Sequence, residues 1–207
     1  MLQDTGERVI PEKMKNTNEV LLEHIARYHF AIEFVRGRVL DFASGSGYGS
    51  HIIAKKCKNK IDEVIGIDID QEAVQYARSI YYHPLTTFLQ GDVTEPNLSK
   101  QLGQFDTIVS FETIEHVEEE EQFLTNIFQM LKPGGTLILS TPFGKGRGVP
   151  CGSPFHVHQL TVDEFQTLFD PYPYKCIDFY YQKGVLIQPA QTNSKTNFPL
   201  GIAVCKK

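Results

Sequence analysis

The feature that most constrains this chain is an apolar run that stops abruptly in glycines, Arg38-Val-Leu-Asp-Phe-Ala-Ser-Gly-Ser-Gly-Tyr-Gly-Ser50. Its nearly continuous apolar residues are typical of a strand buried on both faces of a parallel sheet. The glycines at 45, 47 and 49 allow a tight turn in which the backbone can approach a ligand closely, because glycine has no Cβ. A helix from Gly47 to about Lys56 is expected to follow. The run therefore predicts an α/β fold with a small molecule bound beyond its first strand.

A second apolar strand, Glu63-Val-Ile-Gly-Ile-Asp68, ends in an acid 27 positions after Asp41. A carboxylate at the tip of this strand can accept hydrogen bonds from both hydroxyls of a ribose, which predicts a nucleoside ligand. Dinucleotide sites use the spacing G-x-G-x-x-G to face a pyrophosphate, whereas this turn is G-x-G-x-G preceded by Asp41. An acid at that position repels pyrophosphate and suits the ammonium group of S-adenosylmethionine.

The stretch Asp41-Phe-Ala-Ser-Gly-Ser-Gly-Tyr-Gly49 resembles the first motif of the class I S-adenosylmethionine-dependent methyltransferases. Later motifs of that family are resembled, in the same order, by Ile67-Asp-Ile-Asp70, Gln90-Gly-Asp-Val93, Phe105-Asp-Thr-Ile-Val-Ser-Phe-Glu-Thr-Ile-Glu-His-Val117 and Leu131-Lys-Pro-Gly-Gly-Thr-Leu-Ile-Leu-Ser-Thr-Pro142. Near the N-terminus, Thr5-Gly-Glu-Arg-Val-Ile-Pro11 resembles an element of small bacterial methyltransferases linked to sugar or surface-polysaccharide modification.

This resemblance implies a Rossmann-like sheet of seven strands in the order 3-2-1-4-5-7-6, with strand 7 antiparallel and helices on both faces. It also implies that Asp92 accepts from the adenine amino group and that the amide of Val93 meets a ring nitrogen. The cofactor is expected to be S-adenosylmethionine. The predicted cofactor-binding residues are Asp41, Ala43, Ser44, Gly45, Gly47, Asp68, Ile69, Gly91, Asp92, Val93, Phe111 and Glu112.

The whole chain is expected to be one methyltransferase domain in four segments. These are an N-terminal lid segment and helix over 1–36, a cofactor-binding core over 37–142, a substrate flap over 143–160, and a helix with a C-terminal hairpin over 161–207. Helical spacing predicts a helix over about 17–35 whose capping box is Asn16 with Glu19. Asp70 is expected to cap the helix that begins at Gln71, and Thr161 with Glu164 forms the signature of another capping box.

Three histidines are candidate catalytic residues: His116 in the loop after the fourth strand, and His156 and His158 in the flap. Each is a candidate general base for an acceptor hydroxyl, or a group that orients the substrate. In an extended segment, His156 and His158 point to the same side and supply half of a metal site. No third ligand has a recognisable spacing, so no metal is expected. For Lys145 and Arg147 in the flap the sequence leaves two alternatives: they bind an anionic substrate, or they belong to an exposed, solvated loop.

Composition narrows the class of partner. The net charge of −5 disfavours a nucleic-acid groove, which needs clustered lysine and arginine. No apolar run reaches the roughly 18 to 20 residues that span a bilayer, so no membrane partner and a cytoplasmic location are expected. The four cysteines form no C-x-x-C pair, and Cys176 and Cys205 are expected to be buried thiols. A monomer or homodimer is expected.

The predicted reaction is in-line transfer of a methyl group from S-adenosylmethionine to a hydroxyl or similar nucleophile of a small polar molecule, with a sugar or sugar nucleotide among the candidate substrates. Two alternatives stay open from the sequence. One is an NAD-dependent oxidoreductase, which Asp68 favours and the glycine spacing opposes. The other is a protein that binds S-adenosylmethionine without catalysis.

Overall fold

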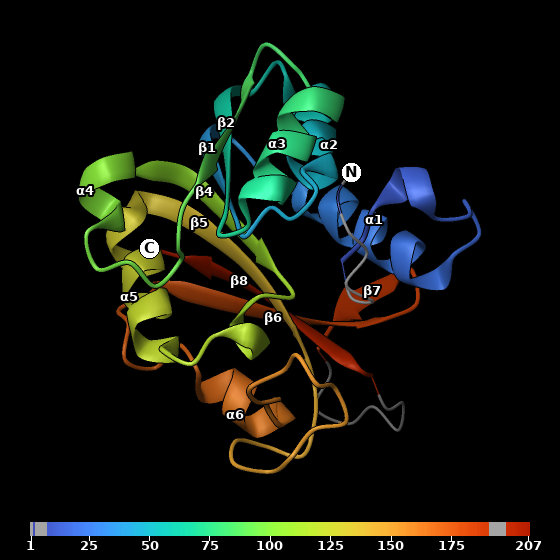
Figure 1. Ribbon diagram of the computed structural model, residues 1–207. Helices are drawn as coiled ribbons and strands as arrows, with labels where there is room; N and C mark the ends of the chain where they lie inside the picture. Colours follow the sequence, from blue (N-terminus) through green and yellow to red (C-terminus); the bar gives the residue numbers. More distant parts are fainter. Residues whose placement is uncertain (1, 3–7, 191–197) are drawn as a thin grey trace.

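The computed structural model describes residues 2, 8–190 and 198–207, and a twisted eight-stranded sheet lies at its centre (Figure 1). The strand order is β3-β2-β1-β4-β5-β8-β6-β7. β1 to β5 run parallel, and β8 is inserted antiparallel between β5 and β6. The strands are β1 (Gly37–Phe42), β2 (Ile61–Asp68), β3 (Thr86–Gln90), β4 (Phe105–Phe111), β5 (Leu131–Pro142), β6 (Cys176–Lys183), β7 (Leu186–Pro189) and β8 (Leu200–Lys206).

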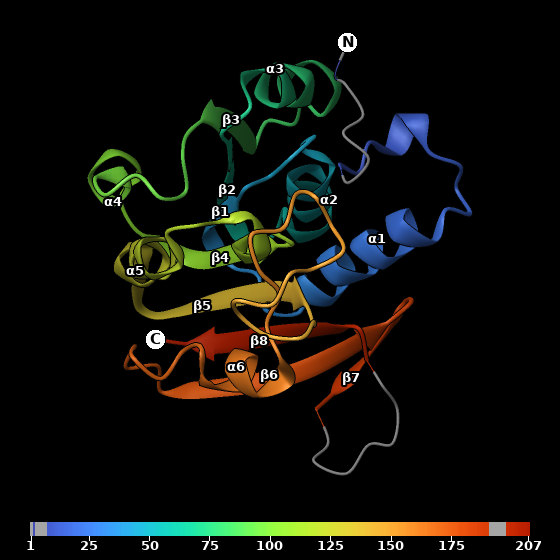
Figure 2. The same ribbon diagram turned by 60° about the horizontal axis from the view of Figure 1, so that its bottom comes forward.

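Helices cover both faces of this sheet (Figure 2). α1, α2 and α3 pack on one face, and α4, α5 and α6 pack on the other. The helices are α1 (Glu19–Ala31), α2 (Tyr48–Cys57), α3 (Gln71–Ile80), α4 (Leu98–Leu102), α5 (Glu120–Met130) and α6 (Val162–Thr167), with the 3-10 helices η1 (Pro11–Lys13) and η2 (Ile114–His116). The predicted Rossmann-like α/β fold is confirmed.

The two-layer core follows from the alternation of side chains along β1. Val39 is buried under the α1–α3 face, whereas Leu40 and Phe42 are buried under the α4–α6 face. Successive side chains of a strand point to opposite faces, so a strand covered on both sides must be apolar almost throughout. Asp41 is the exception, since it is a fully buried acid on the α1–α3 face.

Most predicted elements are confirmed, and four details differ. The cap of α1 is Asn18, whose side chain accepts from the amide of Leu21 over 3.0 Å, and not the predicted Asn16 with Glu19. The tail contains an additional edge strand, β7, so the sheet has eight strands instead of seven. β5 already begins at Leu131, with an irregular register where the breaker residues lie. Cys176 is the first residue of β6 and is exposed, so the prediction that it is buried is wrong, whereas Cys205 is buried as predicted.

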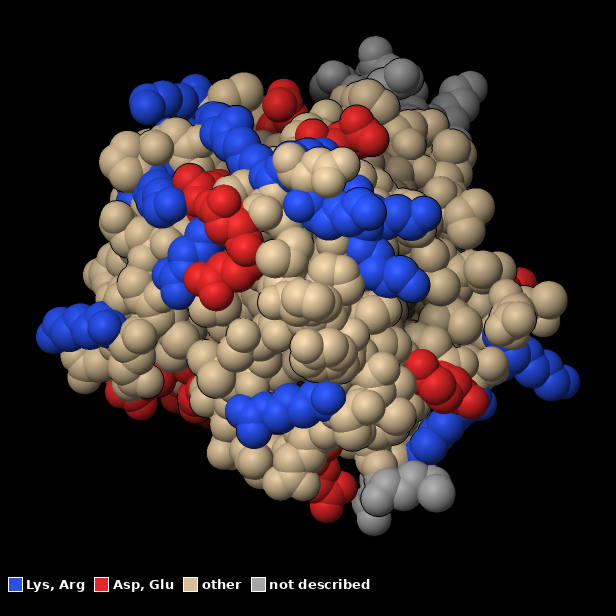
Figure 3. Space-filling view, turned by 90° about the horizontal axis from the view of Figure 1, so that it is seen from above, with Lys and Arg blue, Asp and Glu red and all other residues tan. Residues whose placement is uncertain are grey.

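No helix within the described residues combines the length and the apolar character needed to cross a bilayer. On the face drawn in Figure 3, basic side chains are interrupted by acidic and uncharged ones. This mixture is in keeping with the net charge of −5.

Gly49 in the first turn of α2 allows Tyr28 of α1 to pack directly against that helix. A Cβ at position 49 would lie 1.8 Å from Cζ of Tyr28. The Tyr28 ring is also held by Tyr48 and Phe111, with ring centroids 5.5 and 5.0 Å away. We therefore expect Gly49→Ala to displace Tyr28 and destabilise the protein by about 1 to 3 kcal/mol. Thermal unfolding should show a midpoint lowered by about 2 to 4 °C per kcal/mol.

Gly152 provides the matched control for this substitution. A Cβ there meets nothing within 4 Å, so Gly152→Ala should leave the midpoint nearly unchanged. Equal midpoints for the two variants would contradict the packing role of Gly49.

Candidate active site

The carboxyl ends of the central parallel strands open into a cavity of about 980 Å³. This is the position at which open α/β sheets bind their ligands. The cavity lies between the strand tips, the N-terminal segment with α1, and the tip of the flap. Of the predicted cofactor-binding residues, those that line it are Ala43, Ser44, Gly45, Asp68, Ile69, Gly91, Asp92, Val93, Phe111 and Glu112.

The glycines of the glycine-rich turn have two structural roles: one leaves space for a ligand, and another allows two helices to pack closely. Gly45 has a φ of +55°, and a Cβ built on it meets nothing within 4 Å, so it would project into open space at the cavity wall. Gly47 has a φ of +89°, but a Cβ there would lie 2.5 Å from Cβ of Ala77. Ala43 also has a positive φ, 71°, which is a strained conformation for a residue with a side chain. Gly45 therefore borders the ligand space, and Gly47 allows α2 to approach α3.

Asp68 is held at the tip of β2 by two backbone amides. Its Oδ2 accepts from the amide of Gly45 over 2.8 Å, and its Oδ1 accepts from the amide of Asp70 over 3.0 Å. The side chain lines the cavity although it is only 8% exposed, and burial raises its pKa. A carboxylate fixed in this way keeps lone pairs for a hydroxyl donor from the cavity.

Asp92 and Val93 follow the tip of β3, as the sequence predicts, and both line the cavity. Asp92 Oδ1 accepts from the amide and the hydroxyl of Thr94, over 2.8 and 2.7 Å. The carbonyl of Val93 accepts from the side-chain amide of Asn126 over 2.8 Å. These contacts fix the loop and leave the other oxygen of Asp92 for a donor.

The structure does not place Asp41 in the described lining of the cavity. Its carboxylate is fully buried, and it accepts from the Tyr28 hydroxyl at 3.2 and 3.3 Å and from Ser50 Oγ at 2.6 Å. Burial raises its pKa to about 6, and the hydrogen bonds oppose this rise. Asp41 thus supports the floor of the cavity through Tyr28, which does line it.

The N-terminal segment forms one wall of the cavity. The contacts that hold this segment in place were not predicted from the sequence. Ser46 Oγ donates to the carbonyl of Val9 over 2.7 Å, and Arg8 pairs with Asp70 at 2.8 Å. These two bonds attach the segment to the glycine-rich turn and to the start of α3. Within the Thr5–Pro11 cluster, positions 5 to 7 lie outside the described residues. The lining residues from this part of the chain, which are outside the predicted set of cofactor-binding residues, are Arg8, Val9, Met14, Asn18, Val20, His24 and Tyr28.

At the far end of the cavity, the loop after β4 presents two carboxylates. Glu112 has a φ of 51°, and its Oε1 accepts from Ser140 Oγ over 2.9 Å. Glu115 is 1% exposed, and its Oε2 accepts from Thr141 Oγ1 over 3.2 Å. Burial raises the pKa of Glu115, and the charge of Glu112 raises it further. The sequence located this loop correctly but did not distinguish the buried acid from the others.

His116 and His156 meet beside Glu115, and we call these three residues the Glu115 cluster. The two imidazole rings stand edge to face with centroids 4.8 Å apart. His116 Nδ1 donates to the carbonyl of Phe155 over 3.0 Å, because a carbonyl can only accept. The amide of Val157 donates to the carbonyl of Glu115 over 2.8 Å, so the flap is fastened to η2 by backbone as well.

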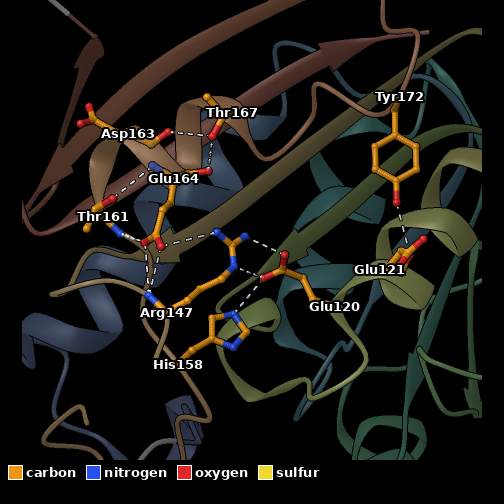
Figure 4. A network of polar contacts seen from close by, with 9 residues as sticks. All are labelled: Glu120, Glu121, Arg147, His158, Thr161, Asp163, Glu164, Thr167 and Tyr172. Carbon is orange, nitrogen blue, oxygen red and sulfur yellow. Dashed lines mark hydrogen bonds and ion pairs between the residues drawn. The ribbon is translucent and has the colours of Figure 1, made fainter. Parts of the chain in front are cut away.

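His158 lies apart from the other two candidate catalytic residues. Its Nε2 is 3.1 Å from Glu120 Oε2, in a network with Arg147 and Glu164 (Figure 4). Arg147 pairs with Glu120 at 2.7 Å, and its backbone amide donates to Glu164. The predicted extended His-x-His arrangement is wrong, because this segment is a loop and not a strand. Among the described lining residues the cavity includes neither Lys145, Arg147 nor His158.

Comparison with known proteins shows the family of this chain. A family model described as "Methyltransferase domain" matches residues 34–169. The chain belongs to the methyltransferase domain family. A probable S-adenosylmethionine-dependent methyltransferase of Mycolicibacterium smegmatis is 33% identical over 171 residues, covering 80% of this chain and 63% of the relative. A ubiquinone biosynthesis O-methyltransferase of Xanthomonas euvesicatoria is 34% identical over 128 residues, covering 60% of this chain and 49% of the relative.

A solved structure shows the same fold. One such structure is described as the "complex between the Haloferax volcanii Trm112 methyltransferase activator and the putative methyltransferase". It superposes with a TM-score of 0.68 at 20% identity, covering 88% of this chain and 89% of that one. The chain spans about three fifths of the length of its mycobacterial relatives, 63% and 58%. The predicted family, enzyme class and cofactor are confirmed: this is an S-adenosylmethionine-dependent methyltransferase domain.

The cavity of this methyltransferase domain fits S-adenosylmethionine chemically. Among its described lining residues, six are carboxylates and Arg8 is the only arginine or lysine. A sulfonium with an ammonium group suits such a lining, whereas the pyrophosphate of NAD does not. The open space at Gly45 and the fixed carboxylate of Asp68 match a ribose. The residues present therefore fit the family's cofactor.

Replacing Asp68 with alanine should weaken cofactor binding. A hydrogen bond to a charged acceptor contributes about 1.5 to 3 kcal/mol, so Asp68→Ala should reduce the affinity for S-adenosylhomocysteine at least about tenfold. Isothermal titration calorimetry measures this affinity, and thermal unfolding without ligand checks that the variant is folded. Asp62→Ala, which changes an exposed aspartate of the same strand, is the control. Equal affinities for the two variants would rule out the ribose role of Asp68.

The buried Asp41 should make stability depend on pH. Its pKa is raised from 3.8 to about 6 in the folded state, so the folded state holds a proton that the unfolded chain releases. Stability due to Asp41 is therefore lost as pH rises between about 4 and 6, by about 3 kcal/mol in all. Asp41→Asn removes this dependence. Urea unfolding of both proteins across this range should show the wild type losing stability relative to the variant.

The exposed Asp62→Asn substitution controls for a general effect of removing an acid. A stability difference between wild type and Asp41→Asn that stays constant from pH 4 to pH 7 would contradict the raised pKa.

Proposed function

We propose that this chain transfers a methyl group from S-adenosylmethionine to a hydroxyl oxygen of a small, uncharged molecule. The observation that carries this proposal is the Glu115 cluster, which lines the same cavity as Gly45, Asp68 and Asp92 but at its other end. A hydroxyl is a weak nucleophile until its proton is drawn away. Imidazole and carboxylate groups at the acceptor end are the side chains that perform this task most often.

Oxygen as the acceptor atom is also supported by a relative. The Xanthomonas euvesicatoria protein is named as an O-methyltransferase, and its aligned region covers 60% of this chain. An amine acceptor needs no base once it is neutral, so it would leave the Glu115 cluster without a chemical role.

The charges of the cavity argue for an uncharged acceptor. Glu112, Glu118 and Glu119 join Glu115 at the acceptor end. The flap cations do not offset these acids, because Arg147 pairs with Glu120 and Glu164 and Lys145 is exposed. A sugar nucleotide would bring phosphates into this acidic lining at a Coulombic cost. We therefore favour a neutral sugar or a phenol over a sugar nucleotide.

The chain supports catalysis mainly by positioning the reactants. When bound, S-adenosylmethionine supplies an electrophilic methyl on its sulfonium. Tyr28 and Phe111 pack edge to face and wall the cavity beside the glycine-rich turn. The Glu115 cluster lies where the acceptor hydroxyl is expected to bind, and it promotes the loss of the hydroxyl proton. Alignment of two reactants can contribute roughly 7 to 11 kcal/mol to lowering a barrier.

His24 lines the same cavity, and its chemistry differs from that of the Glu115 cluster. Its Nδ1 lies 3.1 Å from the Tyr48 hydroxyl, and burial followed by the charge of Arg27 lowers its pKa to about 3. It therefore stays neutral near pH 7 and adds no cation to the acidic lining.

An acceptor panel tests this function. The protein is incubated with S-adenosylmethionine and, in turn, neutral sugars, phenols, sugar nucleotides, amines and thiols, and mass spectrometry identifies the methylated product. We expect a methyl ether from an uncharged hydroxyl compound. His116→Ala should then lower kcat about 10²- to 10⁴-fold, whereas His29→Ala, which changes an exposed histidine of α1, should not. Methylation confined to amines, thiols or sugar nucleotides would refute the proposal.

A further inference from the structure

The Glu115 cluster brings together three side chains that are chemically suited to a metal ion. Glu115, His116 and His156 each offer one ligand atom, and these atoms all lie within 4.8 Å of one another. From the sequence no metal is expected, because no third ligand stands at a recognisable spacing from His156 and His158. In the fold, two of the three ligands, Glu115 and His116, come from η2, about 40 positions before His156 in the chain, and His158 is not part of the cluster.

Glu115 supplies an independent sign that this cluster is incomplete without a ligand. Its carboxylate is 1% exposed, and Oε1 has no hydrogen-bond partner within the described part of the chain. A buried carboxylate oxygen normally has a partner, since leaving it unpaired costs several kcal/mol. Glu115 lines the cavity, and a carboxylate oxygen of this residue lies within 4.8 Å of the ligand atoms of both histidines.

The hydrogen bonds around the histidines are compatible with metal coordination. His116 Nδ1 donates to the carbonyl of Phe155, which leaves the lone pair on Nε2. This bond to a backbone carbonyl is the usual way in which a metal-bound histidine is oriented. His156 Nδ1 lies 3.1 Å from Nε2 of Gln159. A half-turn of the Gln159 amide places its oxygen there, so that Nδ1 of His156 donates and its Nε2 carries the lone pair that a metal ligand needs.

The geometry requires a modest contraction of the cluster. Ligand atoms about 2.1 Å from a tetrahedral ion lie about 3.4 Å from one another. The ligand atoms of the cluster lie within 4.8 Å of one another, so side-chain rotations must bring them closer when an ion binds. Glu115 is buried, whereas His116 is exposed and His156 half-buried. With Glu115 buried and both imidazoles accessible, an ion bound by the three side chains has a coordination position that faces the cavity and can take a further ligand.

We propose that Glu115, His116 and His156 bind a divalent transition-metal ion, such as Zn²⁺ or Mn²⁺, at the acceptor end of the cavity. Two imidazoles with one carboxylate suit these ions better than Mg²⁺ or Ca²⁺, which prefer oxygen ligands throughout. Three protein ligands and an open position are the arrangement of catalytic rather than structural sites.

The role of this ion rests on the proposed function. An acceptor hydroxyl bound at the open position becomes more acidic, as metal-bound water does. Its proton leaves to solvent, the oxygen forms a bond to the methyl carbon, and the bond between that carbon and sulfur breaks. The products are a methyl ether, S-adenosylhomocysteine and one proton. The acidic lining around the site favours the cation electrostatically.

Cobalt titration tests the site without cofactor or acceptor, so its result does not depend on the proposed function. Tag-free, chelator-treated protein is titrated with Co²⁺, whose visible absorption changes when nitrogen ligands bind. We expect one Co²⁺ per chain in the wild type and at least about tenfold weaker binding in Glu115→Gln and in His156→Ala. His29→Ala and Glu121→Gln, which change exposed residues of α1 and α5, are the matched controls and should bind Co²⁺ like the wild type.

Two results would overturn the site: no Co²⁺ binding by the wild type, or wild-type affinity in both Glu115→Gln and His156→Ala. Circular dichroism and thermal unfolding confirm that the variants are folded. The catalytic role is tested separately with an acceptor found in the panel. Chelation should abolish methyl transfer, and Zn²⁺ or Mn²⁺ should restore it while S-adenosylhomocysteine binding stays unchanged. Full activity after complete metal removal would overturn the role.

Discussion

The buried carboxylate of Asp41 is the point at which the sheet, α1 and α2 are joined. It accepts from Tyr28 of α1 and from Ser50 of α2, and it lies on the strand that leads into the glycine-rich turn. An acid can be buried at this depth only because its oxygens are satisfied by such donors. The Tyr28 ring packs directly against Gly49, where a Cβ would overlap it, and against Phe111. The contact of Tyr28 with Asp41 therefore helps to hold α1 over the cavity, together with the contacts of His24 with Tyr48 and of Arg27 with Gln182.

The cavity as a whole is organised by negative charge rather than by shape alone. Its acids come from the tips of β2, β3 and β4, from η2 and from the loop before α5. The cation of Arg8 is already paired with Asp70, and Arg147 is tied to Glu120 and Glu164 outside the described lining. A lining of this kind attracts cationic groups, such as the sulfonium and ammonium of S-adenosylmethionine and the metal ion that we propose.

Most of the fold could be predicted from the sequence because each strand and helix has its own local pattern of apolar and polar residues, and these patterns repeat along the chain. Buried parallel strands must be apolar on both faces, and Asp68 must stand where β2 ends, so both could be read directly. The contacts that the sequence could not supply join distant segments. The burial of Asp41 depends on the path of α1, and the meeting of His116 with His156 depends on how the flap folds back onto η2. Spacing along the chain carries no information on such meetings.

The place of β8 in the sheet has a consequence for how the molecule assembles. β8 follows the other strands in the described chain, yet it pairs with β5 on one side and β6 on the other. β6 and β7 are therefore connected to the parallel half of the sheet only through β8. The hairpin of β6 and β7 can form by itself from local contacts, but it must wait for β8 before it can join the core. Such late, long-range pairing is typical of slow folding steps, and the sheet closes from its interior rather than from its edge.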